Sequence, residues 1–145
     1  MLRRIVPLAV VIAVGVSCSL PALDTADFRS KAAAAAEDAI SQANSAILAT
    51  RLRDRERLPA ATVTVLLEDV ERAALAAVDG FASVLPPDER SDRIRAEVLP
   101  ILEDVADLLA RMRFAARRGD AVALEDLRSS LRGRVAALER WLDAG

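Results

Sequence analysis

The stretch Ser91–Arg118, SDRIRAEVLPILEDVADLLARMRFAARR, decides the fold of this chain. Its apolar residues recur at alternating intervals of four and three, which places them on one face of an α-helix. The stripe consists of Ile94, Val98, Ile101, Val105, Leu108, Met112 and Ala115. It predicts one long helix over residues 88–118 that packs against other helices. Pro100 lies within the pattern, so we expect a kink that leaves the Ala96 carbonyl without its usual partner.

Three other segments also repeat their apolar residues at intervals of three and four, over residues 24–57, 59–85 and 120–143. In the first segment the stripe is thin, because most of its members are alanines: Phe28, Ala32, Ala36, Ala39, Ala43 and Ile47. Small side chains allow another helix to approach closely. Short links with Pro59, Pro86-Pro87 and Gly119 separate the segments. We therefore predict an all-α fold, an antiparallel up-down four-helix bundle that forms a single domain over residues 24–145.

The N-terminal stretch Met1–Cys18 has a different composition. Arg3 and Arg4 are followed by an apolar run over residues 5–16, and then by the small residues Ser17 and Cys18. A basic start, a short apolar segment and a small-residue exit are typical of a secretory signal peptide. The run is shorter than the roughly 20 apolar residues that span a bilayer. We predict that residues 1–17 are a cleaved signal and that the protein is exported.

The four residues Gly15-Val16-Ser17-Cys18 resemble the lipobox of bacterial lipoproteins, with Gly15 at the place where that motif usually has leucine. The resemblance covers only the first 18 residues. It implies that Cys18 becomes the lipidated first residue of the mature chain and that residues 18–23 form a short tether. Lipoproteins of this family carry at least two acyl chains, which hold a protein stably at the outer face of the cell membrane. Ordinary cleavage after Ala22, which yields a soluble secreted protein, is the alternative.

The composition excludes most catalytic chemistries. The chain contains no histidine and no tyrosine, and Cys18 is its only cysteine. Ser–His–Asp and Cys–His sites are therefore impossible, as are di-iron sites of the Glu-x-x-His type, and zinc lacks its usual ligands. We expect a protein that is not an enzyme, with no catalytic residues, metal or cofactor. The net charge of −2 gives no reason to expect nucleic acid as a partner.

The positive charge is almost all arginine, because Lys31 is the only lysine. Together with the abundance of alanine, this suggests GC-rich coding and an actinobacterial source. In an up-down bundle the ends of the first and third helices share one pole. That pole gathers eight arginines: Arg51, Arg53, Arg55, Arg57, Arg111, Arg113, Arg117 and Arg118. They could bind an acidic envelope polymer or protein, or they could serve only the helix macrodipole.

These observations predict a membrane-tethered accessory protein of the cell envelope, with a binding or structural role. The first alternative is a carrier of an apolar small molecule or lipid, held in the bundle core between the alanine-rich first helix and the kinked third helix. Cavity volume separates the two, because a carrier needs a continuous apolar cavity of about 300 Å³ or more. The second alternative is a soluble secreted helical protein. The oligomeric state is left open by the sequence.

Overall fold

The computed structural model describes residues 22–144, which form four α-helices joined by loops. They are α1 (Thr25–Asp54), α2 (Ala60–Ala82), α3 (Glu89–Arg118) and α4 (Ala121–Asp143). The prediction of an all-α fold with four helices is confirmed for these residues. The predicted signal peptide, Cys18 and most of the tether lie outside the described residues.

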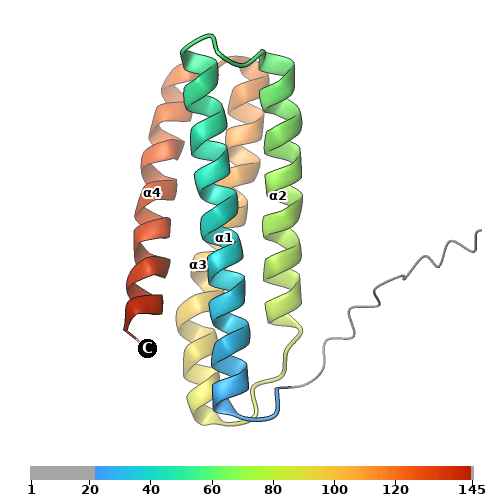
Figure 1. The fold of residues 1–145 in the computed structure, drawn as a ribbon, viewed down its shortest axis with the longest axis vertical. Helices are drawn as coiled ribbons and strands as arrows, with labels where there is room; N and C mark the ends of the chain where they lie inside the picture. The colour runs from blue at the N-terminus through green and yellow to red at the C-terminus, as the bar shows by residue number, and fades with distance from the viewer. Residues whose placement is uncertain (1–21, 145) are drawn as a thin grey trace, which may run out of the picture.

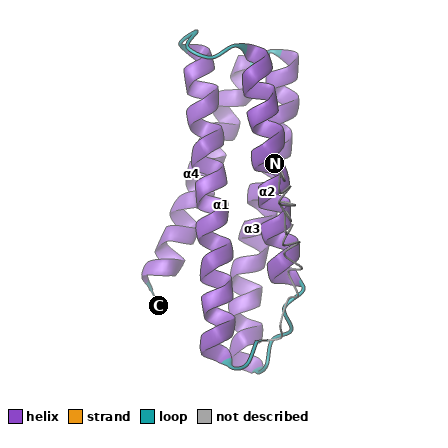
Figure 2. Cartoon of the chain, turned by 45° about the vertical axis from the view of Figure 1, so that its right-hand side comes forward, coloured by secondary structure: helices purple, strands orange, loops and turns teal. Residues whose placement is uncertain are grey.

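The four helices lie side by side along one axis (Figure 1), and α1 and α3 begin at the pole where the described chain starts. The colours of Figure 1 show that α2 and α4 begin at the opposite pole, and a second view (Figure 2) shows the same side-by-side arrangement. Helices α1 and α3 contact each other and both remaining helices, whereas α2 and α4 do not meet within the described residues. The central pair is in parallel register, because Thr25 contacts Asp88 and Arg53 contacts Ala116, each 63 residues apart.

The alanine stripe of α1 forms its buried face. Ala32, Ala36, Ala39 and Ala43 are all buried in the core, as are the larger Phe28 and Ile47 at either end of the stripe. A face of methyl groups lets the backbone of α1 approach its neighbours more closely than a face of leucines would. The bulk of the core comes instead from the other helices, with fully buried Leu67, Leu102, Leu109, Met112, Leu124, Leu131 and Leu138.

Aspartates begin three of the helices. Asp24, Asp88 and Asp120 each accept a hydrogen bond from the backbone N–H three residues further on, at 2.8, 2.8 and 3.0 Å. Each therefore satisfies a donor that the first turn of a helix leaves unpaired. Asp88 also accepts a hydrogen bond from Thr25, and these bonds hold the pKa of its carboxyl below the ordinary value. The carboxylate of Asp88 thus joins the first turns of α1 and α3.

Helix α1 ends at Asp54, three residues before the expected end at residue 57. The backbone of Glu56 adopts the left-handed conformation, with φ of 56°, and the N–H of Arg57 donates to the carbonyl of Leu52 at 2.8 Å. This is the geometry of a Schellman turn, which reverses the chain. Pro59 disfavours helical backbone at Leu58, the residue before it, so the helix does not resume before the proline. Arg55 and Arg57 consequently lie past the end of the helix.

Helix α2 spans fewer residues than expected, beginning at Ala60 after Pro59 and ending at Ala82. Its end is fixed by Arg95 of α3, which donates hydrogen bonds to the carbonyls of Ala82 and Val84. Helix α3 continues through Pro100 as one helix. Pro100 and Ala96 are both exposed, so water can reach the carbonyl that the proline leaves unpaired.

Candidate functional site

The eight predicted arginines gather at the pole formed by the ends of α1 and α3, which we call the arginine pole. Arg51 and Arg53 belong to the last turn of α1, and Arg55 and Arg57 to the loop that follows. The other four, Arg111, Arg113, Arg117 and Arg118, lie toward the end of α3. They do not act alike, because the structure divides them into arginines that hold the bundle together and arginines that face solvent.

Arg53 connects the two central helices. Its Nη1 donates a hydrogen bond of 2.9 Å to the carbonyl of Ala116, in the last turn of α3. Carbonyls at a helix C-terminus lack intrahelical partners and carry partial negative charge, so a guanidinium there is favourable. The contact of Arg53 therefore agrees with the interpretation that these arginines interact with the helix macrodipole.

Arg113 and Arg117 attach α3 to α2. Arg113 pairs with both carboxylate oxygens of Glu71, at 2.5 and 3.2 Å, and both side chains are largely shielded from solvent. The hydrogen bond to Glu71 raises the pKa of Arg113. Arg117 forms a more exposed pair with Glu68, one turn before Glu71. These two arginines are therefore occupied by carboxylates of their own chain.

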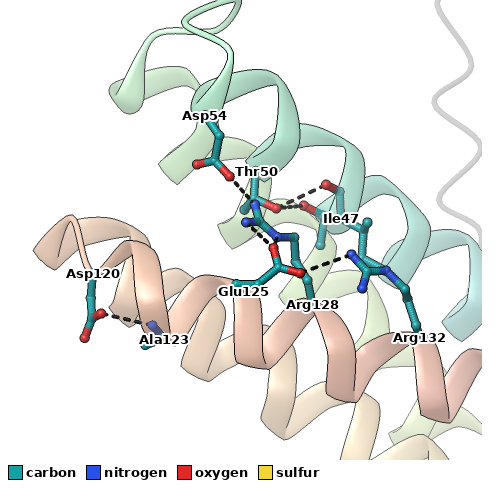
Figure 3. Close-up of polar contacts among 9 residues, drawn as sticks. Ile47, Thr50, Asp54, Asp120, Ala123, Glu125, Arg128 and Arg132 are labelled. Carbon is teal, nitrogen blue, oxygen red and sulfur yellow. Dashed lines mark hydrogen bonds and ion pairs between the residues drawn. The ribbon is translucent and has the colours of Figure 1, made fainter.

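A further arginine of this pole, Arg128 of α4, was not among the eight predicted residues. It is only 5% exposed, and Figure 3 shows it between Asp54 of α1 and Glu125 of α4. Nη1 of Arg128 lies 2.5 Å from Asp54, and Nη2 lies 2.7 Å from Glu125. Arg132 adds a longer contact with Glu125, at 3.6 Å. The sequence feature that could have identified Arg128 is its position within the apolar face of this helix, between Leu127 and Leu131.

The electrostatics of the Arg128 site balance burial against pairing. Burial alone lowers the pKa of Arg128, but the hydrogen bonds to Asp54 and Glu125 outweigh it and the pKa is raised. The hydrogen bond from Arg128 in turn lowers the pKa of Glu125. Arg128 is therefore a fixed, charged link between α4 and the end of α1.

Four arginines of the pole face solvent. Arg51, Arg55, Arg57 and Arg118 are exposed, and their guanidinium groups form no hydrogen bond or ion pair with any residue in the 22–144 range. Arg111 has one long contact, with Asp107 at 3.7 Å. Guanidinium groups with no internal partner can bind carboxylates or phosphates through paired N–H donors. We call Arg51, Arg55, Arg57 and Arg118 the free arginines.

Other kinds of site find less support in the described part of the chain. No group of three or more histidine, cysteine, aspartate or glutamate side chains there could hold a metal ion. No helix in that part combines the length and apolar character needed to cross a bilayer. Comparison of the chain with protein-family models, curated proteins and solved structures found no match. The functional argument therefore depends on the residues and their geometry.

The Arg128 site generates a prediction about stability. Asp54→Ala leaves a buried guanidinium with one carboxylate instead of two, and we expect it to lower the free energy of unfolding by about 1–2 kcal/mol. Arg128→Met removes the buried charge itself and leaves Asp54 and Glu125, whose side chains are 40% and 58% exposed and can be hydrated. We expect this variant to stay within about 1 kcal/mol of the wild type.

Urea unfolding followed by circular dichroism measures both variants. A larger loss for Arg128→Met than for Asp54→Ala would contradict this description, because the guanidinium would then stabilise the fold more than its burial costs.

Proposed function

We propose that this protein is an exported accessory protein of the bacterial cell envelope that binds an acidic partner. In this proposal residues 1–17 are a cleaved signal peptide and lipid on Cys18 tethers the chain to the outer face of the membrane. The helices act as an antiparallel up-down bundle that presents the free arginines to the partner. The proposal assigns no catalytic role to any residue.

The position of the free arginines is the observation that supports this proposal. The described chain begins at one pole of the bundle, and the free arginines lie at the other. Helix α1 has 30 residues, so the two poles are about 45 Å apart. A lipid tether before residue 22 would hold the first pole near the membrane and direct the free arginines away from it. This favours a partner in the envelope rather than the headgroups of the same membrane.

The chemistry of exposed arginines favours a partner with several negative charges. One exposed ion pair contributes about 1 kcal/mol or less, which is too little for specific binding. Several pairs made together add to one another, because the first contact raises the effective concentration for the next. An acidic polymer or a protein with an acidic surface meets this requirement, whereas a single small anion does not.

The carrier alternative has weaker support. Four cavities between the helices are grooves at the bundle surface, each open to solvent and lined partly by charged side chains. The two helices between which a carrier would hold its ligand contribute large, fully buried side chains to the core, Phe28 from α1 and Leu102, Leu109 and Met112 from α3. The soluble secreted protein differs from our proposal only in the fate of Cys18.

Three of the free arginines provide the test of binding. We expect the triple variant Arg51→Ala, Arg55→Ala, Arg57→Ala to bind polyglutamate at least about 10-fold more weakly, measured by fluorescence anisotropy at low salt. The matched control is Arg90→Ala, Arg93→Ala, Arg140→Ala, which removes three exposed arginines from the other half of the bundle. It changes the net charge equally. Equal weakening by both variants would show that net charge, not the pole, governs binding.

The tether is tested by Cys18→Ala. We expect the wild type to fractionate with membranes and to gain the mass of its acyl chains, and we expect the variant to lose both properties. Intact-mass spectrometry and detergent partitioning of the native envelope measure them. A mature wild-type chain that begins after residue 18 without added lipid would leave the soluble secreted alternative in place.

A further inference from the structure

A groove runs between α3 and α4 beside the arginine pole. It has a volume of about 390 Å³, and its lining includes Arg111, Phe114 and Arg118 on the α3 side and Asp126 and Leu127 on the α4 side. A second groove of about 410 Å³ continues along the same two helices and shares Arg111 and Ser130 with the first. These volumes fall within the range of ligand sites in proteins.

Phe114 gives the first groove an apolar wall. It is 49% exposed, although the residues beside it in the groove, Ala115 and Leu127, are buried in the core. The guanidinium carbon of Arg113 lies 4.4 Å from the centre of the Phe114 ring and covers part of it. An aromatic ring that borders a buried apolar floor leaves surface that a bound apolar side chain could cover.

The charges of the groove differ between its two walls. Arg111 and Arg118 lie three residues before and four residues after Phe114, so all three share one face of α3. Arg118 is one of the free arginines. On the other wall the carboxylate of Asp126 forms no hydrogen bond or ion pair with the described residues. The groove therefore offers cations on α3, an acceptor on α4 and an apolar surface between them.

We propose that this groove binds an acidic protein segment in which an apolar or aromatic side chain lies next to the acidic ones. This inference rests on the proposed function and narrows the partner to a protein. The acidic side chains would pair with Arg111 and Arg118, and the apolar side chain would lie against Phe114. Asp126 would accept a hydrogen bond from an N–H of the segment.

The same chemistry disfavours a polyanion without apolar groups. A polyphosphate or an acidic polysaccharide could pair with the arginines, but it would leave Phe114 and the apolar floor in water. A polyphosphate also has no N–H group to donate to Asp126, whose negative charge would repel it. Of these candidates, the peptide is the one that satisfies the cations, the acceptor and the apolar surface together.

The experiment uses the full-length protein in detergent and two fluorescent peptides of equal length and charge, one alternating glutamate with phenylalanine and one alternating glutamate with serine. We expect the wild type to bind the phenylalanine peptide about 10-fold more tightly. Phe114→Ser should remove this preference and leave the affinity for the serine peptide unchanged. The matched control Leu66→Ser, an exposed apolar residue on α2, should keep the preference.

Each other outcome overturns a distinct part of the argument. Equal affinity of the wild type for both peptides, with polyglutamate still bound, would overturn the groove but leave the proposed function standing. Binding of neither peptide nor polyglutamate would overturn both. If sedimentation equilibrium shows a dimer that Phe114→Ser converts to a monomer, the groove belongs to a second copy of this chain and the proposal is overturned.

Discussion

The close contact between α1 and α3 is the constraint on which the rest of the structure depends. Alanines on the buried face of α1 leave room for this contact, and the two helices of 30 residues then run in parallel register. Because their last turns meet at one pole, the arginines of both helices meet there as well. Larger side chains on α1 would push α1 and α3 apart. The arginines at the ends of these two helices would then no longer meet at one pole.

The arginine pole combines structural and exposed charges, and the two groups have different physical consequences. Arg53, Arg113, Arg117 and Arg128 each bond to a neighbouring helix, so they hold the ends of the helices in place. A buried ion pair contributes little net stability. Removing one of its two partners lowers the stability much more, because the other charge is left buried and unpaired. Arg51, Arg55, Arg57 and Arg118 have no such function within the described residues, and this is why they carry the proposed binding.

The helices could be predicted from the sequence because their signals are local. Apolar spacing marks each stripe, and Asp24, Asp120 and Gly119 mark ends through chemistry that involves only neighbouring residues. The end of α1 was less predictable, since Glu56 adopts a left-handed backbone that glycine usually supplies. The division of the arginines could not be predicted, because Arg113 and Arg128 find their partners 42 and 74 residues away in sequence.

The measurement that tests the central contact most directly is the stability of Ala43→Leu against that of Ala34→Leu. Ala43 is fully buried on α1, whereas Ala34 lies on the exposed face of the same helix. We predict that Ala43→Leu lowers the free energy of unfolding by about 1–3 kcal/mol, because the added atoms force the helices apart. We predict a change within about 0.5 kcal/mol for Ala34→Leu. If Ala43→Leu proves as stable as Ala34→Leu, the close approach of α1 to its neighbours is not the constraint described here.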